Sequence, residues 1–175
     1  AAAGKRVRPD LAVFTYQGDG DATVIGIAET LNAAYRNEKI TAVVINNTNF
    51  GMTGGQMSWT SMHGQITTTS EHGRSCEATG NPLHVPEMIA NSFDVAYAAR
   101  GSVHDSKHVN MTKNMLRNAF EAQLNNEGYS IVEILSACPT NWHLSPLKSK
   151  ERIEKELMPE YPIGEFKKRQ LEATV

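Results

Sequence analysis

The sequence has few of the features that mark several common protein classes. Two cysteines, Cys76 and Cys138, stand among 175 residues, which is too few for a disulfide framework. The formal net charge of −2 gives no indication of nucleic acid or an anionic membrane as a partner. No apolar run approaches the roughly 20 residues that span a bilayer, and the first residues do not resemble a secretory signal. We therefore expect a protein of a reducing compartment, with the cytoplasm as the default.

The chain also contains no internal repeat, no low-complexity linker and no boundary that would divide it. With 40% hydrophobic residues, a chain of this length can build one full-sized core. We expect one domain over residues 1–158. The proline-broken tail, residues 159–175, is expected to pack on this domain or on a partner rather than to form core.

The opening residues, AAAGKRVRPD, contain no methionine. Ala1–Ala3 followed by Gly4 is typical of the end of a helix with its C-cap glycine. An extended start is the alternative interpretation. We expect that the sequence lacks an N-terminal segment.

Hydrophobic periodicity predicts alternating strands and helices. Apolar runs without polar alternation indicate strands of a parallel sheet that is covered on both faces, at residues 11–17, 41–47, 95–102 and 129–136. Helical spacing indicates helices at residues 22–37, 85–93, 105–128 and 146–157. The fold class is α/β, a three-layer α/β/α sandwich with a mostly parallel sheet. Residues 48–84 show little periodicity, and a stretch of this length inside a domain is often functional.

The first predicted strand runs into the motif GDGD, residues 18–21. A dinucleotide-binding glycine loop is one interpretation, but its third glycine position is Thr23 and two carboxylates stand where a phosphate would lie. Mg²⁺ commonly bridges carboxylate and phosphate, so Asp19 and Asp21 favour metal plus diphosphate. An ordinary turn is the alternative.

The second predicted strand ends in Asn46 and Asn47. Adjacent parallel strands bring their carboxyl ends to the same edge of a sheet. The Asn47 amide oxygen would then complete a magnesium site begun by Asp19.

These motifs resemble a known family. GDG followed by NN after about 25–30 residues is the thiamine diphosphate motif, and NNTNFGMTGGQMSWTS resembles the β subunit of 2-oxoacid:ferredoxin oxidoreductases. The resemblance continues through TTTSEHGR, AARGSVHDSKH, VEILSACPTNW and MPEYPIGEF, and so covers essentially the whole chain. It implies a thiamine diphosphate-binding fold, of the branch that acts on 2-oxoglutarate or 2-oxoisovalerate rather than pyruvate.

The resemblance also implies roles for individual residues. Asp19 and Asn47 match the side-chain magnesium ligands, and Asn49 matches the residue that supplies a backbone carbonyl. The residues implied on the diphosphate side are Gly18, Asp19, Gly20, Asp21, Asn47, Met52 and Thr53. Some members carry lysine at the position of Gly54, so recognition of the substrate carboxylate is expected from elsewhere.

The implied reaction is oxidative decarboxylation of a 2-oxoacid with coenzyme A, with electrons passing to ferredoxin. An α-type partner subunit would supply the aminopyrimidine-side domain and its activating glutamate, so we assign no catalytic acid or base here; Glu29 is expected to be solvated. A non-oxidative thiamine diphosphate enzyme and a nucleotide-binding module without redox activity are the alternatives.

The remaining candidates are cysteines and histidines. The resemblance matches Cys138 to a ligand of a four-iron four-sulfur cluster whose other ligands would lie upstream; a buried structural thiol is the alternative. His104 and His108 have a zinc-like spacing, but without a third ligand we favour a helix cap around Asp105. His63 and His72 are weaker candidates for a substrate pocket.

Overall fold

The computed structural model describes residues 1–169. Its centre is a five-stranded sheet in the order β1-β2-β4-β3-β5. The strands are β1 (Phe14–Gly18), β2 (Thr41–Asn46), β3 (Tyr97–Ser102), β4 (Ser130–Leu135) and β5 (Gly164–Lys167). The first four are parallel, and β5 pairs with β3 in the antiparallel direction. The predicted mostly parallel sheet is confirmed.

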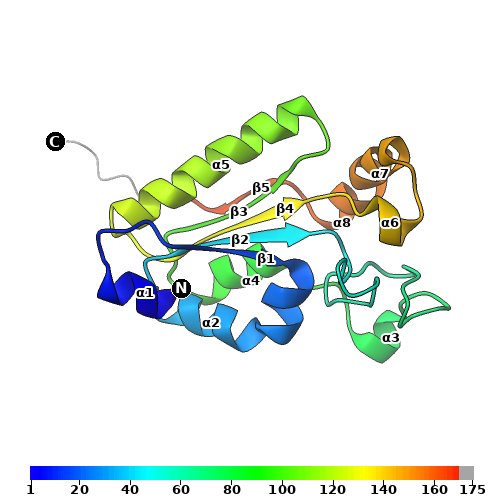
Figure 1. The fold of residues 1–175 in the computed structure, drawn as a ribbon, viewed down its shortest axis with the longest axis horizontal. Helices are drawn as coiled ribbons and strands as arrows, with labels where there is room; N and C mark the ends of the chain where they lie inside the picture. Colours follow the sequence, from blue (N-terminus) through cyan, green and yellow to red (C-terminus); the bar gives the residue numbers. More distant parts are fainter. Residues whose placement is uncertain (170–175) are drawn as a thin grey trace.

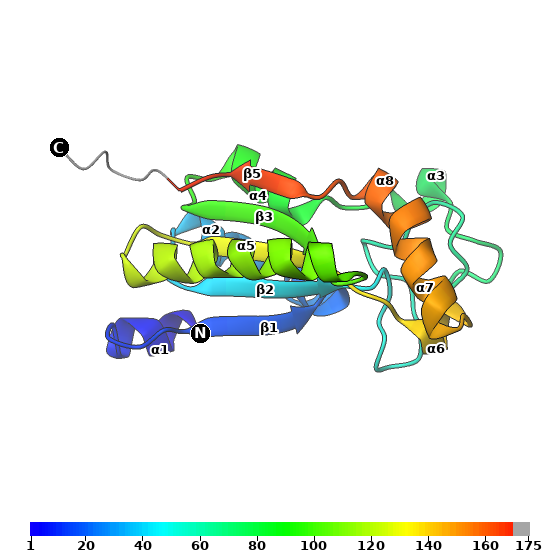
Figure 2. The ribbon, with the colours of Figure 1, turned by 90° about the horizontal axis from the view of Figure 1, so that it is seen from above.

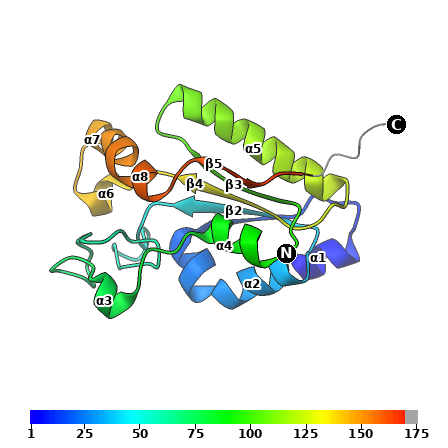
Figure 3. The ribbon, with the colours of Figure 1, turned by 180° about the vertical axis from the view of Figure 1, so that it is seen from behind.

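Helices cover both faces of the sheet (Figures 1 and 2). The long helix α5 (Ser106–Leu124) lies on one face, where Met115 and Ala119 pack against Val43 and Val132. The other face carries α2 (Ile27–Tyr35) and α4 (Val85–Ser92), as Figure 3 shows from behind. The core on that side has its own set of buried residues, which includes Ala33, Val44, Ile89 and Ile131. The α/β/α sandwich is therefore as predicted.

Four predicted elements need correction. The first helix, α1 (Ala2–Val7), runs through Gly4 rather than ending there. The helix predicted over 22–37 is divided at Gly26 into a π-helical turn, η1 (Asp21–Ile25), and α2. The residues between the last predicted strand and the last predicted helix, for which no helix is predicted, contain the short helix α6 (Pro139–Trp142). The last predicted helix is divided into α7 (Pro146–Arg152) and a second π-helical turn, η2 (Ile153–Leu157).

The tail expected to form no core does form core. After α8 (Met158–Glu160), Tyr161 is fully buried with Leu135, Trp142 and Leu157, and β5 follows as an edge strand. Residues 170–175 of the predicted tail lie outside the described part of the chain. β5 has only four residues, too few to show a hydrophobic pattern from which a strand could be predicted. It joins the sheet through backbone pairing with β3.

The segment 48–84 lies at the carboxyl ends of the parallel strands, beside α6, α7 and α8 (Figure 1). Its regular structure consists of the short helix α3 (Cys76–Thr79) and two isolated bridges, as far as the structure describes it. None of the helices within residues 1–169 combines the length and the apolar character needed to cross a bilayer.

Candidate functional site

The ends of β1 and β2 meet as the sequence predicted. Gly18, the last residue of β1, pairs in register with Ile45 of β2. The chain therefore places Asp19 beside Asn46 and Asn47 at the carboxyl edge of the sheet, where ligands bind in open α/β folds.

A cavity of about 180 Å³ opens at this edge. Its lining includes every residue predicted to bind the cofactor or its metal, together with Phe50 and Gly51. The lining residues are Gly18, Asp19, Gly20, Asp21, Asn47, Asn49, Phe50, Gly51, Met52 and Thr53.

Three polar groups converge in this cavity. One end of the Asn47 amide, oxygen in one orientation of the side chain and nitrogen in the other, lies 3.0 Å from Asp19 Oδ1 and 2.7 Å from the backbone carbonyl oxygen of Asn49. Mg²⁺ binds oxygen octahedrally at about 2.0–2.1 Å, which puts neighbouring ligands about 2.9 Å apart. If the amide turned over, its nitrogen would instead donate to both oxygens. A cation would hold the orientation in which the oxygens converge, so these residues fit the metal.

The Asp19 carboxylate is buried and held by two hydroxyl groups. Ser58 Oγ donates to Asp19 Oδ2 at 2.6 Å, and Thr60 Oγ1 donates to the same oxygen. This arrangement leaves Oδ1 facing the cavity. Burial raises the pKa of Asp19 to about 6 against the opposing effect of the two hydroxyls, and the nearby Glu133 adds to the rise. A bound cation would favour the ionised carboxylate.

The other predicted diphosphate residues lie in the same loops. The backbone amide of Gly18 donates to Asp21 Oδ2 at 3.1 Å, so the Asp21 side chain closes its own turn. Thr53 Oγ1 donates to Gln56 Oε1 at 2.6 Å. Met52 is 99% exposed. All three line the cavity, and their roles toward a diphosphate remain predictions.

Sequence reasoning missed the residues that hold Asp19. Ser58 and Thr60 follow it by 39 and 41 positions, within the segment that shows no periodicity. Arg74 in turn holds this segment: its guanidinium is buried and donates to backbone oxygens of Trp59 at 3.0 Å and Gly80 at 3.0 Å, and to Ser61. The segment is rich in Ser and Thr and has no hydrophobic periodicity, so it gave no local signal for these contacts.

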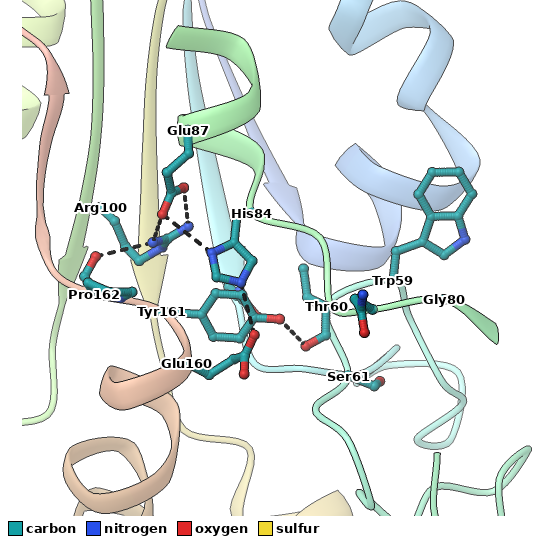
Figure 4. A network of polar contacts seen from close by, with 12 residues as sticks. Trp59, Thr60, Ser61, Gly80, His84, Glu87, Arg100, Glu160, Tyr161 and Pro162 are labelled. Carbon is teal, nitrogen blue, oxygen red and sulfur yellow. Dashed lines mark hydrogen bonds and ion pairs between the residues drawn. The ribbon is translucent and has the colours of Figure 1, made fainter. Parts of the chain in front are cut away.

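A second missed set of contacts lies under the end of β2. Asn46 Nδ2 donates to Glu133 Oε1 at 2.9 Å, and the other oxygen of Glu133 accepts from Arg100. Arg100 also forms two hydrogen bonds with Glu87, each 2.6 Å long (Figure 4). Because Asn46 precedes the predicted metal ligand Asn47, this buried network holds the end of β2 in place.

The C-terminal tail reaches the same region. Tyr161 Oη donates to the carbonyl oxygen of Thr60 at 2.6 Å, and Glu160 lies 2.9 Å from His84 Nε2 (Figure 4). Tyr161 thus supports the residue whose side chain binds Asp19.

Cys138 lies beside the predicted cofactor loop. Its thiol is half-buried and is 3.4 Å from Asn141 Nδ2, which donates to the carbonyl oxygen of Gly51 at 2.8 Å. Trp142 Nε1 also donates to the carbonyl oxygen of Asn47 at 3.2 Å. A four-iron cluster commonly takes four cysteine ligands, and this chain contains two cysteines. The chain by itself therefore has too few cysteines for such a cluster, and the role of Cys138 as one of the ligands remains a prediction.

The histidines divide between two places. His63, with Gly54 and Gly55, lines a separate cavity of about 640 Å³ whose lining does not include His72. His63 Nδ1 is also 3.2 Å from Cys76 Sγ. Asp105 caps α5 by accepting from the backbone amide of His108 at 2.8 Å, so the expected helix cap is confirmed.

Comparison with known proteins agrees with this geometry. Residues 1–134 match the family described as thiamine pyrophosphate enzyme, C-terminal TPP binding domain. The chain belongs to this family. A domain of the family binds thiamine diphosphate, so the predicted cofactor is confirmed and the interpretation as a nucleotide-binding module is set aside.

The relatives of this thiamine diphosphate-binding domain carry the names that the motifs suggested. The chain is 38% identical over 167 residues to the ketoisovalerate oxidoreductase subunit VorA of Methanothermobacter thermautotrophicus, covering 95% of the chain and 35% of that protein. It is 31% identical over 178 residues to the 2-oxoglutarate synthase subunit KorB of Archaeoglobus fulgidus, covering 96% of the chain and 62% of that protein. The predicted resemblance to 2-oxoacid:ferredoxin oxidoreductase subunits is confirmed.

A solved structure shows the same fold. The 2-oxoglutarate:ferredoxin oxidoreductase from Magnetococcus marinus, with 2-oxoglutarate, coenzyme A and succinyl-CoA bound, superposes with a TM-score of 0.70 at 22% identity. The match covers 98% of this chain and 61% of that one. The chain thus spans about one third to two thirds of the length of these relatives, and the relatives named above are subunits of larger enzymes.

Proposed function

We propose that the complete protein is a 2-oxoacid:ferredoxin oxidoreductase and that this chain is its diphosphate-side cofactor domain. The observation that carries the proposal is the convergence of Asp19 Oδ1, the Asn49 carbonyl oxygen and the Asn47 amide, which can turn its oxygen to the same point, in the cavity at the ends of β1 and β2. The names of the relatives support the choice of an oxidoreductase over a non-oxidative thiamine diphosphate enzyme.

Each residue of the site has a proposed part. Asp19 Oδ1, the Asn47 amide oxygen and the Asn49 carbonyl oxygen would bind Mg²⁺, which in turn would bind the diphosphate. Ser58 and Thr60 orient the Asp19 carboxylate so that Oδ1 faces the metal. Gly18, Gly20, Asp21, Met52 and Thr53 would line the diphosphate.

Thiamine diphosphate held by these residues would supply a carbon nucleophile for the 2-oxo carbon and an electron sink for decarboxylation. In the overall reaction the 2-oxoacid and coenzyme A give the acyl-CoA, carbon dioxide, a proton and two electrons. The electrons would leave singly through iron–sulfur clusters to ferredoxin. The two relatives' names make ketoisovalerate and 2-oxoglutarate the substrates to test first.

We also propose that a partner subunit covers the exposed side of the site. Large apolar side chains on the segments around the cavity are exposed, namely Tyr16, Ile25 and Met52. Exposed apolar groups around a site favour an interface. An α-type subunit at this surface would supply the aminopyrimidine-side domain and the catalytic glutamate, and the cytoplasm is the proposed location of the assembly.

The proposal is tested by replacing Asp19 with alanine in the complete protein with its partner subunits. Loss of the buried ligand should abolish magnesium-dependent retention of thiamine diphosphate, measured by equilibrium dialysis, while circular dichroism shows an intact fold. Asp94→Ala is the control, because the Asp94 side chain is 99% exposed and does not line this cavity, and it should retain the cofactor. Equal retention in wild type and Asp19→Ala would contradict the ligand assignment.

Cys138→Ala tests the proposed cluster ligand in the same complete protein. Iron content per protomer should fall, because the thiolate that the cluster needs is removed. Cys76→Ala is the control, since Cys76 contacts His63 rather than the predicted cofactor loop, and it should leave the iron content unchanged. Unchanged iron in Cys138→Ala would make Cys138 a structural thiol.

A further inference from the structure

A cluster of three potential metal ligands lies where β3 gives way to α5. His104 and His108 have the spacing of two zinc ligands, and the structure places Asp105 between them. One ligand atom from each residue lies within 4.8 Å of the others. The third ligand that the sequence did not identify is therefore the residue that caps the helix.

The distances suit a small ion with tetrahedral ligands. His104 Nε2 is 3.2 Å and His108 Nδ1 is 2.8 Å from Asp105 Oδ2. With bonds of about 2.0 Å, the ligands of tetrahedral zinc lie about 3.3 Å apart. The two imidazole rings lie 4.4 Å apart between centroids, tilted by 35°, so both rings stand beside the same carboxylate.

Neighbouring groups orient the three ligands. Ser102 Oγ is 2.8 Å from His104 Nδ1, the ring nitrogen that faces away from the cluster. Asp105 Oδ1 accepts from the backbone amide of His108, whereas Oδ2 pairs with the His108 ring at 2.8 Å, so a metal would take the place of the proton between them. Metal-binding histidines usually form such a hydrogen bond through their second nitrogen.

A nucleophilic triad is the other chemistry that this order of residues suggests. Ser102 Oγ is 2.8 Å from His104 Nδ1, and His104 Nε2 is 3.2 Å from Asp105 Oδ2. However, Ser102 is fully buried and its hydroxyl is also 3.4 Å from the carbonyl oxygen of Leu135. A substrate cannot reach this hydroxyl, so the serine is a support for His104.

We propose that His104 Nε2, Asp105 Oδ2 and His108 Nδ1 bind a divalent transition metal of the Zn²⁺ type. Two imidazoles and one carboxylate suit zinc far better than magnesium. β4 lies between β3 and the strand that carries Asn47, so the site differs from the predicted magnesium site. With three protein ligands, a fourth position stays open, as in zinc sites that bind water or another ligand.

The fourth ligand is expected to be an anion. The adjoining cavity is lined by Lys113 and Lys150 together with the first turn of α5, and both the lysines and a helix N-terminus attract negative charge. Hydroxide or a small carboxylate would satisfy the metal and these positive groups together.

The test uses the complete protein with its partner subunits, saturated with Mg²⁺ and thiamine diphosphate and kept anaerobic. Zinc is added alone, and bound zinc is measured after equilibrium dialysis. Wild type should bind one zinc per chain more tightly than Asp105→Asn or His108→Ala, by at least tenfold in dissociation constant. Asparagine is a good N-cap, so Asp105→Asn keeps the helix start while it removes the charged ligand.

His72→Ala is the control, because His72 is an exposed histidine of the long loop, and it should bind zinc as wild type does. Zinc should also raise the melting temperature of wild type and of His72→Ala but not that of Asp105→Asn, and excess Mg²⁺ should not displace it. Equal zinc binding and equal melting shifts in wild type, Asp105→Asn and His108→Ala would overturn the proposal.

Discussion

At the scale of the residue, the two glycines of the GDGD motif, Gly18 and Gly20, are subject to different steric constraints. A Cβ atom at Gly20 would lie 2.3–2.6 Å from ring atoms of Phe50, whereas one at Gly18 would meet only Asp21 Oδ2, at 3.5 Å. Neither residue has a positive φ. Gly20 is thus required by the close approach of Phe50, a residue of the loop that carries the predicted metal ligands, and not by its backbone conformation.

Gly20→Ala should therefore be destabilising, by about 1–3 kcal/mol, as expected when a methyl group is forced into a packed site. Gly18→Ala should change the free energy of unfolding by less than about 1 kcal/mol, because its new contact is ordinary and alanine restricts the unfolded chain. Chemical denaturation of the two variants measures this difference. Equal losses would show that Phe50 moves aside without cost.

The long segment 48–84 has little regular structure, yet at the scale of the element it has a definite organisation. Arg74 is buried and donates to backbone oxygens that lie before and after it in the segment, including those of Trp59 and Gly80. An arginine can do this because its planar guanidinium carries five donors in fixed directions. The result is an ordered loop that presents Ser58 and Thr60 to Asp19.

Arg74→Ala should loosen this segment more than the sheet. Several backbone carbonyls would lose a charged donor, which we expect to cost at least about 2 kcal/mol. Hydrogen exchange should become faster in residues 58–81 while β2 and β4 keep their protection. Arg8→Ala is the control, because Arg8 and Asp10 form a pair in which both side chains are more than half exposed and such pairs contribute about 0–1 kcal/mol. Unchanged exchange in Arg74→Ala would mean that the loop is held by other contacts.

At the scale of the whole molecule, the two ends of the domain are coupled through the site. The tail that begins at Tyr161 adds β5 to the sheet, fills the core beside Trp142 and Leu157, and donates a hydrogen bond to Thr60. Thr60 binds Asp19, which follows β1. The tail, predicted to pack on the domain or on a partner without forming core, is therefore part of the support for the predicted cofactor site.

Tyr161→Phe should lower both the stability of the protein and its retention of the cofactor by a small amount. The lost hydrogen bond should lower the free energy of unfolding by about 1 kcal/mol. Magnesium-dependent retention of thiamine diphosphate by the complete protein should weaken as well, because Thr60 is held less firmly. Tyr35→Phe, at a tyrosine that is 74% exposed, should change neither measurement. If Tyr161→Phe loses stability but keeps full cofactor retention, the tail supports the fold without supporting the site.

The sequence by itself determined the four parallel strands of the sheet and which of their ends carry Asp19 and Asn47. Both rest on local patterns, namely β-branched apolar runs and the polar residues that follow them, and parallel strands necessarily bring those ends together. Tertiary structure alone decided what holds the site. Ser58, Thr60 and Tyr161 act across 39, 41 and 101 residues of chain, and no periodicity marks such contacts. A hydroxyl in a loop becomes a partner for a buried carboxylate only when folding excludes water from both.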